Sequence, residues 1–174
     1  MRHVDDHRFK QIMAETQNRV RAMSFVHEKL YHSEDLSHVD LANYTRFLAN
    51  HLFSFYGVDS RRITLDVSIG KIMLDINTAI PLGLIINELT SNALKHAFPN
   101  GRTGSLSIAV RKEDKILHLT FNDNGIGVPE DFDWQHTESL GFQLVISLVE
   151  QLDGTIELDR STGNCFTIIV KEKG

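Results

Sequence analysis

Three polar residues near the middle of the chain are spaced so that they could hold a metal-bound phosphate. Glu88, Asn92 and Lys95 are separated by four and then three positions, so on a helix they would share one face. The amide oxygen of Asn92 is a hard ligand suited to Mg2+, which keeps several waters and takes few protein ligands. Lys95 could then meet a phosphate as a point charge. The alternative is a solvated helix face that carries one Glu/Lys pair.

A second candidate is Asp123, at the end of a predicted strand. Residues 116–123 alternate apolar and polar side chains, and the period of two places Asp123 on the apolar face. A carboxylate that points toward the core must be paired or must bind something, because burying an unpaired charge is costly. Gly125 and Gly127 follow, and glycines let a ligand lie close against the main chain. The alternative is an ordinary Asp-Asn-Gly turn that closes a strand.

Hydrophobic periodicity predicts the elements that must position these residues. The helix that carries the phosphate residues is expected to begin after Pro81, where an apolar stripe starts. One further helix is expected between an N-cap at Asp40 and a stop at Gly57, and another between Ser139 and Gly154. Strands are predicted over residues 63–69, 106–110, 116–123, 155–159 and 165–171.

The N-terminal residues predict a long helix of a different kind. No helix breaker interrupts residues 8–32. A heptad-like spacing relates Phe9, Met13, Thr16, Val20, Met23, His27 and Leu30. This seam predicts a helix packed on another helix, in a bundle or a dimer; the alternative is an amphipathic helix that lies on its own domain. We place a boundary between residues 33 and 40, which divides the chain into a helical region, 1–36, and a larger domain, 37–174.

The composition limits the possible functions. A net charge of -5 over 174 residues argues against a nucleic-acid partner, which would need a basic patch. The single cysteine, Cys165, excludes an intrachain disulfide, and no Cys/His spacing resembles a zinc site. No apolar run reaches transmembrane length and the start lacks a signal-peptide core. We therefore expect a cytoplasmic location without membrane contact from this stretch, although the full-length protein could be membrane-tethered.

The segment between the last predicted helix and the glycine turn is polar and irregular. Glu130 to Glu138 contains the only tryptophan, Trp134, and is expected to be a short flexible loop. It leads into Ser139-Leu-Gly-Phe142 at the start of a predicted helix, where free backbone amides and the helix dipole favour a phosphate. Many helices begin with serine and glycine nearby, so this signal is weak on its own.

The order of these motifs resembles a known ATP-binding domain. An Asn/Glu helix, an Asp-x-Gly-x-Gly turn, a glycine-containing loop before a helix and a terminal strand pair follow one another over residues 39–174. This series resembles the domain shared by gyrase, heat-shock protein 90, histidine kinases and the MutL family. The resemblance implies an α+β fold, a two-layer sandwich of helices and a mixed, mostly antiparallel sheet (Bergerat-type ATPase fold), preceded by an N-terminal amphipathic helix.

Two segments make the resemblance more specific. Asn87-Glu-Leu-Thr-Ser-Asn-Ala-Leu-Lys-His96 resembles the form found in histidine kinases. Gln17-Asn-Arg-Val-Arg21 and His27-Glu-Lys-Leu-Tyr31 resemble the second helix of the dimerisation region in sensor kinases related to the HWE class. Strict HWE members are expected to have histidine where Asn87 stands, so the chain resembles a sister group.

On the phosphate side, the resemblance assigns four residues. Asn92 would coordinate the Mg2+ of ATP, and Lys95 would contact phosphate. Glu88 would be catalytic, polarising the acceptor or an attacking water. Gly141 would belong to the phosphate-side loop, with residues 130–140 as the lid. The family often has two glycines in this loop, whereas Ser139 holds one of those positions here.

On the base side, the resemblance assigns four more. Asp123 would accept a hydrogen bond from the adenine amino group, and Gly125 and Gly127 would shape that pocket. His96 would line it. A Gly-Thr pair that supports the adenine site in the family stands here as glycine followed by Asn164, which could still act through a water.

The resemblance implies the ATP-binding catalytic part of a two-component sensor histidine kinase. Such a part presents the γ-phosphate of ATP to a histidine on a dimerisation helix, for relay to a response regulator. The expected partners are an upstream dimerisation helix or a second protomer, and the response regulator. The alternatives are an ATP-driven conformational ATPase or a serine kinase of the same superfamily, or a degenerate nucleotide-binding module without kinase activity.

The phosphoacceptor itself is harder to place. His7-Arg-Phe-Lys10 superficially resembles the start of the acceptor motif, but it lies only 20 residues before His27. At a rise of about 1.5 Å per residue, that is too short for a helix, a turn and a returning helix. We therefore expect the phosphoacceptor helix to be missing here, and this chain alone to be unable to phosphorylate itself.

Overall fold

The computed structural model describes residues 6–31, 38–129, 131–137 and 139–173. Its main sheet has the strand order β2-β4-β5-β7-β6. The strands are β2 (Ile63–Ile69), β4 (Gly104–Glu113), β5 (Ile116–Asp123), β6 (Thr155–Asp159) and β7 (Asn164–Lys171). β2 pairs parallel with β4, and the other neighbours pair antiparallel. The mixed, mostly antiparallel sheet is confirmed.

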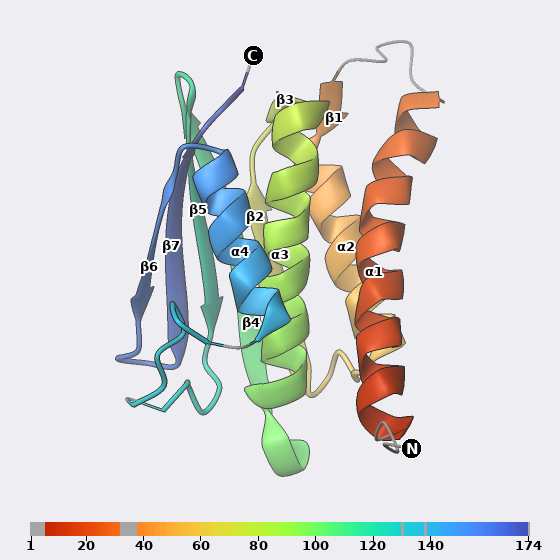
Figure 1. Ribbon diagram of the computed structural model, residues 1–174, viewed down its shortest axis with the longest axis vertical. Coiled ribbons are helices and arrows are strands. Elements are labelled where there is room, and N and C mark those ends of the chain that lie inside the picture. The colour runs from red at the N-terminus through yellow and green to blue at the C-terminus, as the bar shows by residue number, and fades with distance from the viewer. Residues whose placement is uncertain (1–5, 32–37, 130, 138, 174) are drawn as a thin grey trace, which may run out of the picture.

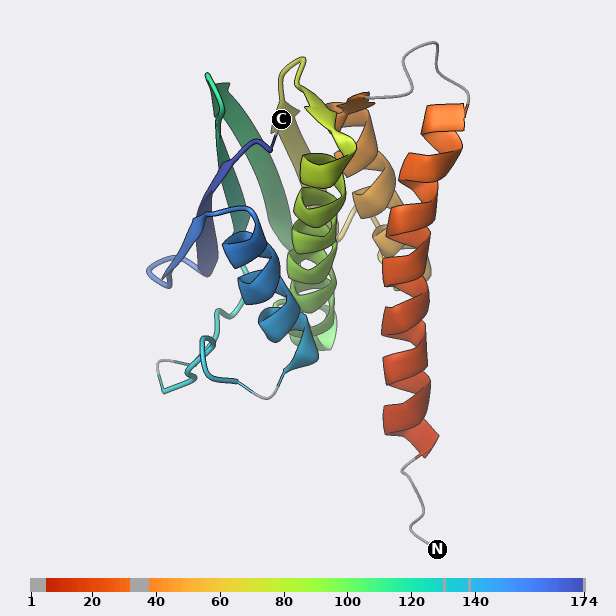
Figure 2. The same ribbon diagram turned by 45° about the horizontal axis from the view of Figure 1, so that its top comes forward.

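The helices are α1 (Asp6–Tyr31), α2 (Leu41–Phe55), α3 (Ile76–His96) and α4 (Leu140–Gln151). Figures 1 and 2 both show α3 and α4 against one face of the sheet, α2 beside α3, and α1 outermost. This is the expected two-layer α+β sandwich with a preceding helix. The helix α3 is therefore central, because it contacts the sheet layer, both neighbouring helices and α1.

Alternation along the strands builds the core beneath these helices. Leu117, Leu119 and Phe121 of β5 are buried; all three lie across from buried residues of β7, and the last two also lie across from buried residues of β4. Burying each such side chain contributes about 1.5–3 kcal/mol. Asp123 continues this inward-facing series of β5 side chains and is paired with Asn164 of β7. The inward face of β5 therefore ends in a carboxylate beside an amide.

The start of α3 differs from the sequence expectation. The helix begins at Ile76, so the prediction that it follows Pro81 was wrong. Asp75 is its N-cap: the carboxylate accepts bonds from the Asn77 amide (2.7 Å) and from the Thr78 hydroxyl (2.7 Å). Proline lacks the N–H that would bond to the carbonyl four residues earlier. Pro81 therefore removes one backbone hydrogen bond from the second turn of α3. The N-cap and the burial of the helix compensate for this loss.

Some short elements carry no periodic signal. β1 (His38–Asp40) and β3 (Met73–Asp75) pair antiparallel, and a 3-10 turn spans Pro99–Gly101. Three residues are too few to show an alternation, so the sequence did not predict these strands. The expected N-cap of α2 is confirmed, because the Asp40 carboxylate accepts a bond from the Asn43 amide at 3.1 Å.

The helix α1 has two different faces. Asn18, Ala22 and Phe25 are buried against the domain. The described members of the heptad seam point away from it and are exposed: Phe9, Met13, Thr16, Val20 and Met23. The side chains of His27 and Leu30, and most of the predicted boundary between residues 33 and 40, lie outside the described residues. The helix thus lies on its own domain through one face and keeps the seam free for another helix.

Candidate nucleotide site

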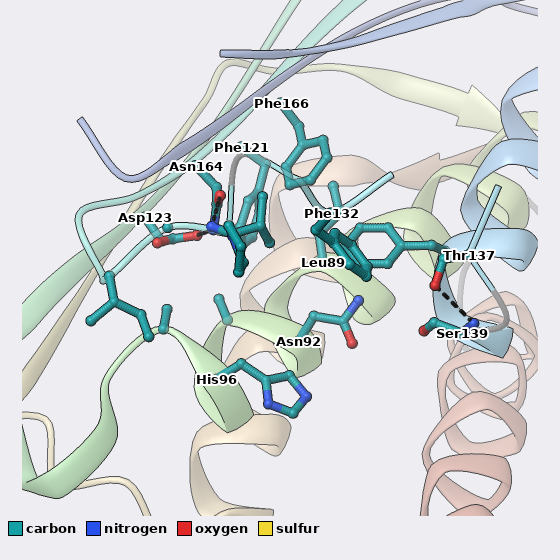
Figure 3. Close-up of a pocket in the computed structure, with 17 residues that line it drawn as sticks. Leu89, Asn92, His96, Phe121, Asp123, Phe132, Thr137, Ser139, Asn164 and Phe166 are labelled. Atoms are coloured by element: carbon teal, nitrogen blue, oxygen red, sulfur yellow. Dashed lines mark hydrogen bonds between the residues drawn. The ribbon is translucent and has the colours of Figure 1, made fainter. Parts of the chain in front are cut away.

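A cavity of about 450 Å3 lies between α3, the turn after β5, the start of α4 and β7. Its volume is within the range of small-molecule sites. Its apolar wall includes Leu89, Phe121, Phe132, Phe142 and Phe166. The polar side chains that line it are Asn92, His96, Asp123, Thr137, Ser139 and Asn164. Figure 3 shows Asp123 and Asn164 on one side, Thr137 and Ser139 on the other, and Asn92 and His96 on α3.

Asp123 is the buried carboxylate that the strand pattern predicted. It is 1% exposed, and its oxygens accept bonds from the Gly125 amide and from the Asn164 side chain, each at 3.0 Å. Burial raises the pKa of Asp123, and the hydrogen bonds oppose that rise. Each carboxylate oxygen has two acceptor sites, so Asp123 retains acceptor capacity for a donor from a ligand.

Asn164 contributes more directly than the sequence indicated. Its amide nitrogen donates to Asp123, and its oxygen accepts a bond from the Val128 amide at 3.0 Å. It therefore links β7, the buried carboxylate and the turn after β5. The strand register that pairs it with Asp123 is the signal that could have found it, and that register requires the folded sheet.

The two glycines after Asp123 serve different purposes. Gly127 has a φ of 71°, a left-handed conformation that favours glycine, and it lines the cavity. Gly125 does not line the cavity. A Cβ atom there would collide with Ala97 at the end of α3, and the following residue, Ile126, donates its amide to the Ala97 carbonyl at 2.9 Å. Gly125 thus lets the turn approach α3 closely.

Asn92 and His96 provide the polar wall from α3. The Asn92 amide nitrogen is buried and has no hydrogen-bond partner. Burial, helped by the charge of Lys95, lowers the pKa of His96, so its ring is neutral at pH 7. Within the described part of the chain, no three His, Cys, Asp or Glu side chains gather as a metal cluster. The Asn92 amide oxygen could serve as a single ligand for Mg2+ carried in with phosphates, and its unpartnered amide nitrogen could donate to a phosphate oxygen.

Glu88 and Lys95 lie beyond the cavity wall and are engaged by α1. Glu88 is 5% exposed, and Arg19 donates to both of its oxygens at 2.8 Å. Lys95 bonds to Glu15 at 2.6 Å. The sequence did not identify Glu15 or Arg19 as neighbours of this site, because nothing in a helix pattern tells which distant helix it will face.

Gly141 lies at the start of α4, next to the same two α3 residues. A Cβ atom at this position would be 2.9 Å from a Glu88 oxygen and 3.6 Å from the Asn92 amide nitrogen. The glycine therefore allows the N-terminus of α4 to approach α3. Ser139 is the N-cap of α4 without a side-chain cap bond, which leaves helix amides available at this end.

The segment before α4 is anchored by aromatic packing. Trp134 is 7% exposed and meets Phe166 edge-on, with ring centroids 5.9 Å apart. Arg160 donates to the carbonyls of Pro129 (3.0 Å) and Phe132 (2.9 Å). The expected loop is present, with no helix or strand among its described residues, 131–137, but Trp134 is buried because its ring completes the core.

Comparison with known proteins identifies relatives for both parts of the chain. Residues 1–56 match a family described as histidine kinase. Residues 77–174 match the family described as histidine kinase-, DNA gyrase B-, and HSP90-like ATPase. No helix among the described residues is long and apolar enough to span a bilayer.

Curated relatives and solved structures agree with these matches. Sensor histidine kinase PdtaS of Mycobacterium tuberculosis is 30% identical over 172 residues, which are 95% of this chain and 34% of that protein. Blue-light-activated histidine kinase 2 of Erythrobacter litoralis is 33% identical over 64% of this chain and 32% of its own length. The chain thus spans about a third of these relatives. The histidine kinase domain of an Erythrobacter litoralis blue-light activated kinase superposes with a TM-score of 0.81 at 25% identity, over 91% of this chain and 75% of that one.

Proposed function

The chain belongs to the family of histidine kinase-, DNA gyrase B- and HSP90-like ATPases, and we propose that it is the ATP-binding catalytic part of a two-component sensor histidine kinase. It binds Mg-ATP as substrate and presents the γ-phosphate to a histidine on a dimerisation helix. A response regulator then receives the phosphoryl group. The proposed setting is cytoplasmic, with or without a membrane tether elsewhere in the full-length protein.

The observation that carries this proposal is the buried acceptor at one side of an apolar cavity. Asp123 accepts a hydrogen bond from the adenine amino group through its remaining acceptor sites. Asn164 and the Gly125 amide hold the carboxylate in place. Phe121 and Leu89 form part of the apolar wall that would hold the base. His96, neutral at pH 7, adds a polar edge without a positive charge next to the base.

The phosphates extend from the base across α3 toward the start of α4. Asn92 and the start of α4 at Gly141 lie close together there, and Lys95 is one turn farther along the helix. Helix N-terminal amides favour phosphate oxygens. Mg2+, held by the Asn92 amide oxygen, would neutralise phosphate charge when bound. Phosphoryl transfer depends mainly on positioning and charge neutralisation, and these residues supply both.

Glu88 is the proposed catalytic carboxylate, because it lies within a few ångströms of Asn92 and the start of α4. It would polarise the nucleophilic nitrogen of the acceptor histidine. The exposed seam of α1 supports a partner helix as the carrier of that histidine, since its members Phe9, Met13, Val20 and Met23 are apolar and exposed. The partner helix belongs to upstream sequence or to a second protomer.

Calorimetric titration with Mg-ATP tests the proposal. Asp123→Ala removes the acceptor for adenine and should weaken binding at least about tenfold, the effect of losing one hydrogen bond to a charged group. The matched control is Asp66→Ala, which removes an exposed aspartate from β2 of the same sheet and should leave affinity unchanged. Circular dichroism establishes that each variant is folded. Equal affinity of wild type and folded Asp123→Ala would refute the assignment of the base site.

A further inference from the structure

Two α3 side chains with a proposed role, Glu88 and Lys95, do not line the cavity, and both are paired with α1. Arg19 holds Glu88 through two bonds of 2.8 Å, and Glu15 holds Lys95 at 2.6 Å. Glu15 and Arg19 are four residues apart on α1, and their charges are opposite to those of the residues they meet. Both pairs are largely withdrawn from solvent, with side-chain exposures of 15–20% for Lys95, Glu15 and Arg19 and 6% for Glu88.

We propose that Glu15 and Arg19 form an electrostatic latch that closes the phosphate end of the nucleotide site, with the Glu15 carboxylate standing where a phosphate must bind Lys95. This inference rests on the proposed function. The Glu15 carboxylate and a nucleotide phosphate are both anions that would bind the Lys95 ammonium group, so binding of one excludes the other. The latch and the bound triphosphate are therefore mutually antagonistic, and the antagonism is reciprocal by linkage.

Arg19 completes the latch at Glu88. A carboxylate that is 5% exposed needs a partner, since an uncompensated buried charge is expensive. Arg19 meets that need with a two-bond fork that occupies one acceptor site on each oxygen. While the fork persists, Glu88 is a poorer acceptor for the proton of an incoming histidine. The closed latch thus weakens phosphate binding and withholds the proposed catalytic carboxylate at the same time.

The remaining contacts of α1 divide it into an anchor and a movable part. Ala22 and Phe25 are buried, and the Ala22 carbonyl accepts a bond of 3.0 Å from the buried Tyr44 hydroxyl. These contacts lie on the C-terminal side of the latch. The N-terminal side carries Glu15, whose contact with α3 is polar. Asn18, which lies between the two latch residues, is also buried, and its side-chain oxygen is 3.3 Å from a ring nitrogen of His51 on α2. The turn that carries Glu15 can therefore leave α3 while Asn18, Ala22 and Phe25 remain in place.

Lys95 keeps a second contact that does not depend on α1. Its ammonium lies 5.9 Å from the centroid of the Tyr56 ring, and the Tyr56 hydroxyl is 2.7 Å from the Ser91 hydroxyl on α3. A cation beside an aromatic face is held without being neutralised. When Glu15 withdraws, Tyr56 keeps Lys95 near the site with its charge available to a phosphate.

Isothermal titration of the whole chain with Mg-ATP and, separately, with adenosine tests the latch. Glu15→Gln removes the competing charge and preserves side-chain size, and Glu15→Ala also removes the residual hydrogen bond. Both should tighten Mg-ATP binding by roughly threefold to tenfold, as expected when a partly buried ion pair no longer competes. Adenosine, which has no phosphate, should bind wild type and both variants equally.

Glu172→Gln is the matched control, because it breaks another partly buried ion pair, Lys112–Glu172 at 2.7 Å, far along β4 from the cavity. Glu172→Gln should change neither the affinity for Mg-ATP nor the affinity for adenosine. Hydrogen exchange adds a second measurement: Mg-ATP, but not adenosine, should speed exchange of α1 amides around Glu15 in the wild type.

The outcomes separate the latch from the proposed function. If wild type binds both ligands and the Glu15 variants bind Mg-ATP no more tightly, the latch is overturned and the nucleotide site stands. An equal gain for adenosine also overturns it, because the effect would then not depend on phosphate charge. If neither wild type nor the variants bind Mg-ATP or adenosine, the proposed function fails and the latch fails with it.

Discussion

At the scale of single residues, the cavity is defined by Asp123 and the groups that hold it. A buried carboxylate is tolerated because Asn164 and the Gly125 amide donate to it, yet desolvation still raises its pKa. The folded state therefore binds this proton more tightly than the unfolded chain does. The stability that Asp123 contributes through this shift is fully present below the ordinary value of 3.8 and is lost as pH rises through the folded pKa.

The raised pKa of Asp123 predicts how base binding changes with pH. Protonation removes the charge that attracts the adenine amino group, so adenosine affinity should fall as the pH is lowered through a pKa above 3.8. Adenosine is the better probe here because its binding does not involve phosphate titration. Titrations from pH 8 down to the acid limit of folding measure the effect. In Asp123→Asn the decline should be confined to the lower pH at which the adenine ring itself is protonated, and an unchanged decline in that variant would assign the effect to another group.

At the scale of elements, α3 and α2 approach each other more closely than side chains normally allow. A Cβ atom on Gly83 of α3 would collide with the ring of Tyr44 on α2, and Tyr44 is 1% exposed and fully enclosed. Glycine in a helix interior costs about 1 kcal/mol relative to alanine. The close approach offsets that cost, because it lets the Tyr44 hydroxyl donate a hydrogen bond to the Ala22 carbonyl of α1.

The variant Gly83→Ala tests this contact. Helix propensity favours it by about 1 kcal/mol, but overpacking against an enclosed ring costs typically about 1–3 kcal/mol. We expect overpacking to win and the free energy of unfolding to fall by about 1–2 kcal/mol. Denaturant unfolding measures the change. Gly70→Ala is the control, since a Cβ atom there meets nothing within 4 Å. This variant should raise the free energy of unfolding or leave it unchanged. A more stable Gly83→Ala would show that Tyr44 can move.

The outward seam of α1 predicts self-association. Val20 is 56% exposed in the single chain, so Val20→Glu should change stability by less than about 0.5 kcal/mol. It should nevertheless abolish helix pairing, because a charge at the centre of an apolar seam is not tolerated there. Sedimentation over a range of concentrations measures the assembly. Arg21→Glu changes charge at an exposed position outside the seam and should associate as wild type does. Monomeric wild type at all concentrations would contradict the pairing.

At the scale of the whole molecule, one helix organises both halves of the site. The inner face of α3 lines the cavity through Asn92 and His96, and its outer face holds α1 through Glu88 and Lys95. Any change in α1 that is transmitted to Arg19 thus reaches the nucleotide site directly. The arrangement joins the exposed seam of α1, the proposed catalytic carboxylate and the proposed phosphate ligand across a single helix pair.

Labelling with ATP carrying a radioactive γ-phosphate tests the role of the whole chain. α1 is one continuous helix from Asp6 to Tyr31, without the turn and returning helix that an acceptor hairpin needs. We therefore expect little or no label on this chain alone. Strong label mapped to His7, whose side chain is outside the described residues, would contradict that expectation. Release of ADP without any phosphoprotein would favour the ATPase alternative.

Much of this protein was determined by local sequence. The alternation that ends in Asp123, the stripe of α3 and the glycine turn are set by short-range periodicity and by backbone conformation. They predicted the α+β fold and the strands, which the structure confirmed, and the resemblance to histidine kinases, which the comparisons confirmed. Periodicity failed where elements are three residues long and at Pro81, because a capping aspartate outweighed one missing hydrogen bond.

Only the tertiary structure decided which distant groups meet. The register of β5 and β7 brings Asn164 onto Asp123, aromatic packing buries Trp134, and the docking of α1 brings Arg19 to Glu88. A periodic pattern states which face of an element is apolar, but it contains no information about which face of another element will cover it. The chemistry on α3 could therefore be predicted from its own residues, whereas the partners that restrain that chemistry could not.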